Sequence, residues 1–512
     1  MKNLLFLPFW IAFILGVSAQ NKITLHFDSA EHQISRHIYG HFSEHLGHCI
    51  YGGFYVGEEN QLIPHQKGIR KDVVSALKKL QIPNLRWPGG CFADTYHWKD
   101  GIGPKADRPT IVNTWWGGIT EDNSFGTHEF LELCEQLETE PFISGNVGSG
   151  TVQELADWVQ YTNAAHESPM SKWRKENGQA DPWKVQYWGL GNEAWGCGGN
   201  MRAEYYADLY RQYATYFTAA AKGSDIYRIA AGGYSDHIKW TEVLMKNIPH
   251  KLMEGISLHH YSVIDWADKG PSTKFTEDHY FATMQKALAM EKHVQDHSAV
   301  MDKYDPEKKI ALIVDEWGGW YEVEPGTNPG FLYQQNTMRD AMIAGTTLNI
   351  FNNHCERVKM ANLAQTINVL QAVILTEGEQ MLLTPTYHVL DLYKVHQDAK
   401  MIPLQVKSEA YPFKDQQLSA ISASASINEE EEIHISLVNI HSSKEQEVRI
   451  DLNGMDISQM SGQLLTATTI QTYNTFAAPA TIQPQSFDGI TKDGEEVIVR
   501  IPPFSVVVLK IE

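Results

Sequence analysis

Two glutamates, Glu193 and Glu316, are the residues whose positions most clearly indicate chemistry. Each stands at the end of an apolar run that we predict to be a buried strand, Val185–Leu190 and Ile310–Asp315. A carboxyl group at the end of a core strand is costly unless it is paired or used. Cleavage of a glycosidic bond needs two such groups, one to protonate the leaving oxygen and one to attack or to activate water. The alternative is two structural ion pairs, but strand-end carboxylates in barrel enzymes are usually catalytic.

Short apolar segments alternate with amphipathic helical patterns from residue 38 to about residue 388. The predicted strands are Ile38–Phe42, Asn84–Trp87, Pro141–Asn146, Val185–Leu190, Arg228–Gly232, Gly255–His260, Ile310–Asp315 and Leu348–Asn353. The predicted helices include Ile69–Leu80, Thr127–Leu137, Val152–Asn163, Ala203–Ala221 and Phe275–His297, where apolar residues recur at three- and four-residue spacing. Eight such units predict an α/β fold, a (β/α)₈ TIM barrel with function at the C-terminal ends of its strands. A doubly wound sheet is the alternative.

The pattern changes after about Tyr387, where helical periodicity fades and β-branched residues alternate with polar ones. The predicted strands there are Leu418–Ser424, Ile433–Asn439, Glu447–Leu452, Glu496–Ile501 and Ser505–Ile511. This pattern is typical of an all-β sandwich, here expected to be jelly-roll-like. We therefore expect a signal peptide at 1–19, a strand within 20–37 that joins the sandwich, a catalytic barrel at 38–386 and a C-terminal sandwich at 387–512.

The composition is that of a globular protein, with 43% hydrophobic and 20% charged residues in a chain of 512. The formal net charge of -20 argues against nucleic acid, whose phosphates need a basic face, and against anionic membrane surfaces. The 14 Trp and 22 Tyr suit sugar binding, although large cores use aromatic residues too. A neutral substrate is the best match.

The N-terminus resembles a secretory signal. Lys2 precedes an apolar stretch from Leu4 to Val17, and small residues follow at the spacing that predicts cleavage after Ala19. A membrane anchor is the alternative, but the stretch is short for a bilayer span. The sequence therefore predicts a secreted or periplasmic protein.

The five cysteines, at positions 49, 91, 134, 197 and 355, are odd in number and widely spaced. This arrangement does not look like a disulfide framework, and at least one thiol should be free or paired between chains. No Cys-x-x-Cys pair indicates zinc.

Two motif matches are misleading. His41-Phe42-Ser43-Glu44-His45 fits a zinc protease pattern, but that chemistry needs both histidines on one helical face, and here the segment follows a strand. Gly189–Ala194 fits a dinucleotide fingerprint, but its Asn-Glu would put a carboxylate against a pyrophosphate. We predict neither a metal nor a cofactor.

Several segments together resemble the α-L-arabinofuranosidases of glycoside hydrolase family 51. They are Gly40–Gly47, Leu85–Phe92, Gly189–Trp195, Ser257–Tyr261, Val314–Trp317 and Ala361–Gln365, which occur in order and span nearly the whole barrel. The resemblance implies a barrel with a C-terminal β-sandwich and a retaining mechanism. In the sandwich the similarity is mostly architectural.

On this resemblance Glu193 is the expected general acid/base and Glu316 the expected nucleophile. Trp188 and Trp195 would lower the polarity around Glu193 and raise its pKa. Glu316 must stay ionised and needs hydrogen-bond donors. Plausible donors are Arg86 and, by resemblance to the family's sixth-strand tyrosine, Tyr261.

Five further residues are expected to bind the sugar or to orient the catalytic pair. Asn192 resembles the residue that bonds the sugar 2-hydroxyl, or it is a turn residue. Glu44 resembles a first-strand glutamate that holds ring hydroxyls, or it is a structural partner of an arginine or histidine. Gln365 resembles a residue that reaches the same sugar, or it starts a helix. Cys91 stands where the family places a Cys or Asn against the sugar, or it is an inert thiol. His259 should orient a catalytic glutamate, or it is a core histidine.

Tryptophans 115, 116, 317 and 320 are candidates for the walls of the cleft, and Trp195 lies beside the acid/base. Trp115 and Trp116 lie in a Gly- and Pro-rich stretch of the kind that shapes a leaving-group subsite.

The sequence thus predicts an exo-acting glycosidase that removes terminal α-L-arabinofuranose from plant polysaccharides such as arabinan and arabinoxylan, or from their oligomers. The alternatives are a retaining β-glucanase or β-xylosidase of the same clan, and a non-catalytic carbohydrate-binding protein. The presence of both Glu193 and Glu316 argues against the last. The predicted partner is an arabinose-containing substrate, with no nucleic acid and no membrane, and a homo-oligomer is possible.

Overall fold

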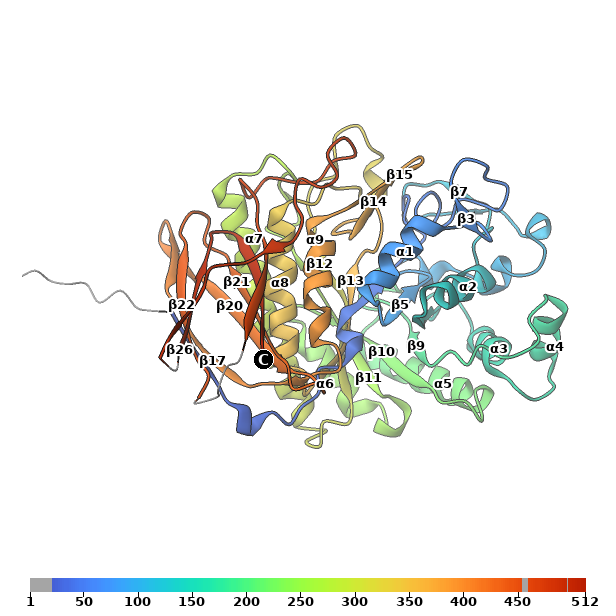
Figure 1. Ribbon diagram of the computed structural model, residues 1–512. Coiled ribbons are helices and arrows are strands. Elements are labelled where there is room, and N and C mark those ends of the chain that lie inside the picture. Colours follow the sequence, from blue (N-terminus) through green and yellow to red (C-terminus); the bar gives the residue numbers. More distant parts are fainter. Residues whose placement is uncertain (1–20, 454–458, 495) are drawn as a thin grey trace, which may run out of the picture.

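Eight parallel strands close into a barrel at the centre of the molecule (Figure 1). The computed structural model describes residues 21–453, 459–494 and 496–512, so the predicted signal peptide lies outside the described residues. In barrel order the strands are β2 (Gly40–Phe42), β5 (Asn84–Trp87), β8 (Glu140–Gly145), β9 (Tyr187–Leu190), β10 (Tyr227–Tyr234), β11 (Gly255–Ser262), β12 (Ala311–Gly319) and β13 (Val358–Ala364). The ring closes where β13 pairs with β2, Leu363 opposite His41. The predicted (β/α)₈ barrel is confirmed, and a doubly wound sheet is excluded.

Helices connect and cover these strands. They are α1 (Lys71–Leu80), α2 (Thr127–Leu137), α3 (Val152–Asn163), α4 (Pro169–Glu176), α5 (Ala203–Ala220), α6 (Ile238–Asn247), α7 (Glu277–Asp302), α8 (Met338–Asn353) and α9 (Pro385–Tyr393). Local hydrogen bonds fix where several of them begin. The Thr151 hydroxyl accepts from the Glu154 amide at the start of α3, and Asp340 accepts from the Thr337 amide at the start of α8. Such caps satisfy donors that the first helical turn leaves free.

One predicted strand is wrong. Leu348–Asn353 is the last part of helix α8, and the eighth barrel strand is β13. Helix α8 packs between barrel strand β12 and the C-terminal sheet, so side chains are buried on every face of it. A helix buried all round has no polar stripe, and a short apolar piece of it cannot be told from a core strand by periodicity. Gly345 allows the close approach, because a Cβ there would lie 2.8 Å from Val438 Cγ2.

The C-terminal region is a sandwich of two sheets. One has the order β17 (Leu404–Lys407), β1 (Asn21–Leu25), β22 (Gln446–Asp451), β26 (Glu496–Ile501) and β25 (Ile490–Asp493). The other has the order β16 (Lys400–Met401), β20 (Ile421–Ile427), β21 (Ile433–Asn439), β27 (Ser505–Ile511), β23 (Met460–Leu465) and β24 (Gln485–Ser486). Apolar side chains from both sheets form one core, among them Ile435, Leu437, Val448, Val499 and Val507. Strand β1 enters this domain from the N-terminal side, parallel to β22.

In the described ranges, four two-stranded hairpins lie outside the barrel and the sandwich. They are β3 (His65–Gln66) with β4 (Ile69–Arg70), β6 (Ile111–Val112) with β7 (Thr120–Glu121), β14 (Ile374–Glu377) with β15 (Gln380–Leu383), and β18 (Ala410–Phe413) with β19 (Gln416–Ser419). The last hairpin divides the predicted strand Leu418–Ser424, because Leu418 pairs with Tyr411 before β20 begins. The predicted domain boundary near residue 387 falls inside α9, so its position stays a prediction.

The sandwich packs on the barrel through α7, α8 and α9 (Figure 1). The Tyr280 hydroxyl of α7 donates to the carbonyl of Ile440 at 2.7 Å, which joins the two parts across a buried contact. Over the described ranges, no helix combines the length and the apolar character that crossing a bilayer would need.

Candidate active site

Glu316 lies within β12 and is surrounded by donors at the C-terminal end of the barrel. Arg86 Nη1 on β5 lies 2.8 Å from Glu316 Oε1, and the Tyr261 hydroxyl on β11 donates to Glu316 Oε2 at 2.8 Å. Arg86 also donates to Asn192 Oδ1 at 2.7 Å, so one guanidinium orients two of the predicted site residues. Both donors expected from the sequence are therefore in place, each in contact with one oxygen of the Glu316 carboxyl group.

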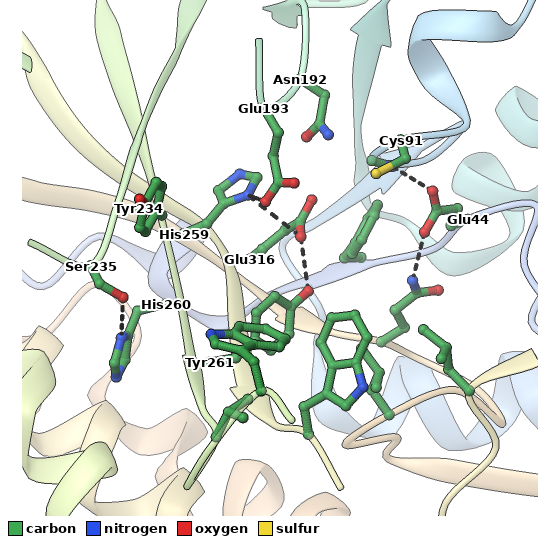
Figure 2. A pocket seen from close by; sticks show the side chains of 18 of the residues that line it. Glu44, Cys91, Asn192, Glu193, Tyr234, Ser235, His259, His260, Tyr261 and Glu316 are labelled. Atoms are coloured by element: carbon green, nitrogen blue, oxygen red, sulfur yellow. Dashed lines mark hydrogen bonds and ion pairs between the residues drawn. The ribbon is translucent and has the colours of Figure 1, made fainter. Parts of the chain in front are cut away.

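Glu193 follows β9 in a turn that places its side chain opposite Glu316 (Figure 2). Its backbone has φ of 38°, a left-handed conformation that a residue other than glycine adopts at a cost of about 1–3 kcal/mol. Hydrogen bonds hold the turn. The Asp94 carboxylate accepts from the amides of Asn192, Val147 and Gly148 at 2.8–2.9 Å. The buried Asp94 carboxylate thus fixes the backbone next to the predicted acid/base.

His259 lies between the two glutamates. Its Nδ1 is 2.8 Å from Glu193 Oε1 and 3.5 Å from Glu316 Oε2, and its Nε2 is 3.2 Å from Asp315 Oδ1. Burial disfavours the charged ring, but the surrounding carboxylates outweigh burial and raise the pKa of His259 to about 10. With this pKa the His259 ring is an imidazolium at neutral pH, in contact with both predicted catalytic glutamates.

The surroundings of Glu193 favour its protonated form. Burial raises the pKa of Glu193 above its usual value, and the negative charge of Glu316 acts in the same direction, while the hydrogen bond from His259 opposes both. Trp188 does not contribute as predicted. It lies outside the barrel against Trp158 and Phe217, with its Nε1 donating to the carbonyl of Val185.

Glu44 occupies the other end of the site. Its Oε1 accepts from Trp116 Nε1 at 2.9 Å and from two backbone amides, and its Oε2 accepts from Gln365 Nε2 at 2.9 Å (Figure 2). Burial first, and then the charge of Glu316, raise the pKa of Glu44 to about 7. Three predicted binding residues thus form one hydrogen-bonded group. Among the described residues, Glu44 forms no hydrogen bond or ion pair with an arginine or a histidine, which was the structural alternative predicted for it.

These side chains line a pocket of about 770 Å³. Its inner part is lined by Glu44, Cys91, Asn192, Glu193, His259, Tyr261, Glu316 and Gln365, which brings together every residue predicted to be catalytic or sugar-binding. The outer part carries aromatic rings. Trp195 packs on Tyr234 with ring centres 4.4 Å apart, and Trp320 packs on Trp266 at 5.4 Å.

The predicted cleft tryptophans divide into two groups. Trp116, Trp195 and Trp320 line the pocket. Trp317 does not, because it is buried against Phe351 of α8 on the outer side of the barrel, and Trp115 is 41% exposed away from the lining. Trp317 points outward because successive side chains of a strand point to opposite faces, and its neighbour Glu316 faces inward.

The zinc-like motif does not assemble a ligand set. His45 donates from Nδ1 to Glu121 at 2.9 Å and accepts from Trp87 at its Nε2, so both ring nitrogens are engaged away from Glu44. Two other groups bring metal-ligating atoms within 4.8 Å of one another in the described residues: Glu193 with His259 and Glu316, and Glu193 with Cys91 and Cys197.

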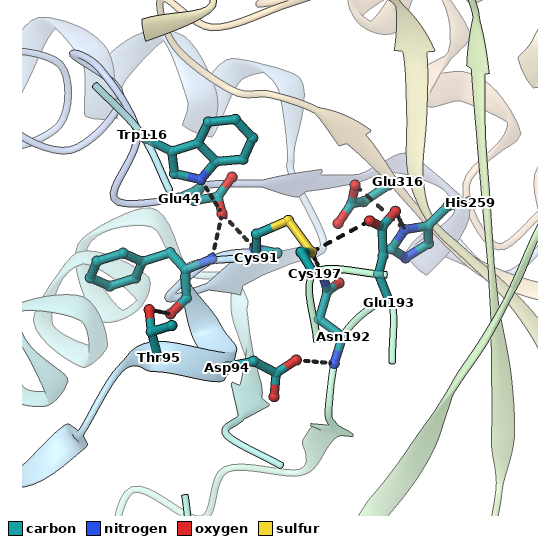
Figure 3. Close-up of a disulfide and its surroundings, with 12 residues drawn as sticks. Glu44, Cys91, Asp94, Thr95, Trp116, Asn192, Glu193, Cys197, His259 and Glu316 are labelled. Atoms are coloured by element: carbon teal, nitrogen blue, oxygen red, sulfur yellow. Dashed lines mark hydrogen bonds and ion pairs between the residues drawn. A yellow bond between two sulfur atoms is a disulfide. The ribbon is translucent and has the colours of Figure 1, made fainter. Parts of the chain in front are cut away.

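At least one free thiol was predicted and three are present, but the one disulfide was not predicted. Cys91 and Cys197 form a disulfide, with their Cα atoms 5.5 Å apart, while Cys49, Cys134 and Cys355 are free and buried (Figure 3). The pair was missed because its members lie 106 residues apart, in the loops after β5 and β9, and only closure of the barrel brings these loops together.

Asp315 contacts two residues of the site, Arg86 and His259, although the sequence did not single it out. Consecutive side chains in a strand normally point to opposite faces. In β12, however, the register shifts between Val314 and Trp317, and both Asp315 and Glu316 contact Arg86, at 3.4 and 2.8 Å. Arg86 and His259 outweigh burial and lower the pKa of Asp315, which keeps it an anion. The only sequence feature that pointed to Asp315 was its position next to Glu316, in one of the segments that resemble the family. Nothing in the sequence pointed to Tyr234 or Trp266, which line the outer part of the pocket.

Comparisons with known proteins agree along the whole chain. The family model for the alpha-L-arabinofuranosidase 1 domain matches residues 76–299, and that for the alpha-L-arabinofuranosidase C-terminal domain matches residues 315–505. An intracellular exo-alpha-L-arabinofuranosidase of Bacteroides ovatus is 50% identical over 507 residues, 98% of each chain. The crystal structure of the GH51 arabinofuranosidase from Xanthomonas axonopodis pv. citri is 47% identical, with a TM-score of 0.94, covering 96% of this chain and 100% of that one. The arabinose complex of the Thermotoga maritima alpha-L-arabinofuranosidase is 31% identical, with a TM-score of 0.85 and the same coverage.

These comparisons overturn one prediction. The expected secreted or periplasmic location, after cleavage at Ala19, is wrong, because the Bacteroides ovatus relative that matches 98% of this chain is named an intracellular enzyme. An apolar N-terminal stretch with small residues after it is a weak signal by composition alone.

Identity at this level over nearly the full length, together with the barrel and its pair of carboxylates, shows that this chain belongs to glycoside hydrolase family 51 and is an α-L-arabinofuranosidase.

Proposed function

We propose that the enzyme is a retaining exo-α-L-arabinofuranosidase in which Glu316 is the nucleophile and Glu193 the general acid/base. The observation that carries this proposal is the spacing of the two side chains, since oxygens of Glu193 and Glu316 lie within 4.8 Å of each other. Retaining glycosidases hold their carboxyl groups about 5–5.5 Å apart, whereas inverting enzymes need about 6.5–9.5 Å to admit a water molecule.

The first step follows from the different surroundings of the two groups. The Glu316 carboxylate, oriented by its contacts with Arg86 and Tyr261, attacks the anomeric carbon while Glu193 gives its proton to the leaving oxygen. A covalent glycosyl-enzyme forms and the shortened substrate leaves.

The second step reverses the roles. Glu193, now a carboxylate, takes a proton from water, which attacks the anomeric carbon and releases arabinose with its original configuration. The His259 imidazolium stabilises whichever of the two carboxylates is charged, because it contacts both.

Exo action is supported by a group of hydrogen-bonded side chains on one side of the pocket. Glu44, Gln365 and Trp116 form these hydrogen bonds, and the Glu44 carboxylate can pair with ring hydroxyls of one terminal sugar. The leaving group would then lie toward Trp195, Tyr234 and Trp266, where flat rings can stack on a second sugar. The proposed substrates are arabinose side chains of plant polysaccharides such as arabinan and arabinoxylan, or their oligomers. A homo-oligomer stays a prediction, to be measured by light scattering.

The test compares Glu193→Ala, Glu316→Ala and the unmodified enzyme on nitrophenyl arabinofuranoside, xyloside and glucoside. Only the arabinofuranoside should be cleaved well, and early-time NMR should show the retained anomer. Azide should rescue Glu193→Ala with formation of a glycosyl azide, because an anionic nucleophile needs no general base. Glu316→Ala should stay inactive with an activated leaving group, since no glycosyl-enzyme can form. An inverted product, or a folded Glu193→Ala that azide does not rescue, would contradict the assignment.

A further inference from the structure

The Cys91–Cys197 disulfide lies directly beside the proposed acid/base (Figure 3). Cys197 Sγ is 3.6 Å from Glu193 Oε2, while the other oxygen, Oε1, is bonded to His259. Both cysteines are partly exposed, and Cys91 lines the pocket, so a small reductant can reach the bond. The three remaining cysteines are buried, and burial raises the pKa of Cys355 to about 11, which makes that thiol unreactive.

Reduction would convert this wall of the pocket into a pair of thiols. A dithiol reductant attacks one sulfur as a thiolate and then closes its own disulfide, so the bond between Cys91 and Cys197 breaks and each protein sulfur gains a proton. The Cα separation of 5.5 Å keeps both sulfurs within reach of one point.

The distance between Cys197 Sγ and Glu193 Oε2 matches that between two ligands of a tetrahedral zinc site. With Zn–S of about 2.3 Å and Zn–O of about 2.0 Å, a thiolate and a carboxylate on one zinc ion lie about 3.5 Å apart. The distance from Cys197 Sγ to Glu193 Oε2 is 3.6 Å, and the ligating atoms of Cys91, Cys197 and Glu193 all lie within 4.8 Å of one another. The His259 contact would hold the carboxylate from its far side, as outer partners of metal ligands commonly do.

We propose that, once this disulfide is reduced, Cys91, Cys197 and Glu193 form an inhibitory site for zinc or a similar thiophilic divalent cation. The cation displaces the two thiol protons and the Glu193 proton into solvent and keeps one position open for water. Two thiolates and a carboxylate suit a soft divalent cation, whereas the intact disulfide offers no thiolate. Binding removes the proton that glycosylation needs. The inhibition rests on the proposed role of Glu193, but the binding does not.

The test uses the full chain in oxidised and reduced forms, with metal and reductant removed before each titration. Thiol titration of the unfolded protein should give three thiols before reduction and five after it, from the cysteine count and the one disulfide. Zinc at one equivalent should lower arabinofuranoside hydrolysis more than tenfold in the reduced form alone, and a chelator should restore it. Cobalt should give a thiolate-to-metal absorption band in the reduced form alone, which reports binding without using activity.

Two variants make the assignment specific. Cys197→Ser should lose both the zinc response and the cobalt band, each judged against its own metal-free sample. Cys355→Ser removes a buried thiol remote from the pocket and should keep both. A folded Glu193→Gln should bind cobalt more weakly, which tests the carboxylate as a ligand even if its catalytic role is wrong. Equal zinc inhibition of both redox forms, a cobalt band retained in Cys197→Ser, or no cobalt band after reduction would overturn the proposal.

Discussion

Replacing His259 with glutamine should move the alkaline limb of the pH–rate profile. In the unmodified enzyme, kcat/KM should fall at high pH as Glu193 loses the proton that it must donate. The His259 imidazolium, 2.8 Å away, stabilises the Glu193 carboxylate and so opposes the rise that burial gives to its pKa. Without that cation Glu193 should keep its proton to higher pH, and the limb should move in the alkaline direction.

The distance sets the size of the effect. At an effective dielectric of about 20, two unit charges 2.8 Å apart interact by about 6 kcal/mol, which is an upper limit of about four pKa units. The glutamine amide can replace the lost hydrogen bond, and Asp315, freed from its contact with the ring, remains paired with Arg86. We therefore expect a shift of about 1–3 units, the range that one neighbouring charge usually gives.

The measurement is kcat/KM against pH with an arabinofuranoside whose leaving group needs protonation. His260→Gln is the matched control. His260 is the next residue on β11, but its ring contacts Ser235 and the carbonyl of Lys286 and lies outside the ionised group, so this variant should leave the alkaline limb in place. An alkaline limb that stays fixed or moves to lower pH in His259→Gln would refute the idea that His259 acts as a cation on Glu193.

Three further outcomes are expected. Tyr261→Phe should lower kcat/KM about 10- to 100-fold in steady-state assays, because a hydrogen bond to a charged carboxylate contributes about 1.5–3 kcal/mol; an unchanged rate would show that the bond does not orient Glu316. Gly90→Ala should lower the rate with the fold intact by circular dichroism, since its Cβ would lie 2.8 Å from Glu316 Oε1, whereas Gly196→Ala, with nothing closer than 3.7 Å, should lower it far less. Metal chelators should leave the rate unchanged, and a loss that zinc restores would indicate a metal-dependent step.

Most of the barrel could be predicted because its strands and helices carry separate periodicities. The helices at Thr127–Leu137 and Val152–Asn163 match the structure residue for residue, since each has one apolar face and a polar one. The prediction of the eighth strand was wrong because the helix there has no polar face. The sandwich buries that helix on one side and the barrel buries it on the other. Burial by another domain is not visible in local sequence.

The site could be predicted because each of its side chains lies at or just after the C-terminal end of a predicted strand. Glu44, Glu193, Tyr261 and Glu316 meet because the C-terminal ends of parallel strands share one rim. Contacts that depend on closure of the barrel were not predictable, and the disulfide between two loops is the clearest case.

Trp188 and Trp317 show why residue type alone misassigns a cleft. Both stand next to or near a glutamate that we propose to be catalytic, yet each packs outward against a helix, on Phe217 of α5 and Phe351 of α8. Of the two tryptophans predicted to lower the polarity around Glu193, only Trp195 lines the pocket. The pKa of Glu193 rises through burial, with the charge of Glu316 adding to it, so depth in the pocket and a second carboxylate favour the protonated form that the proposed general acid needs.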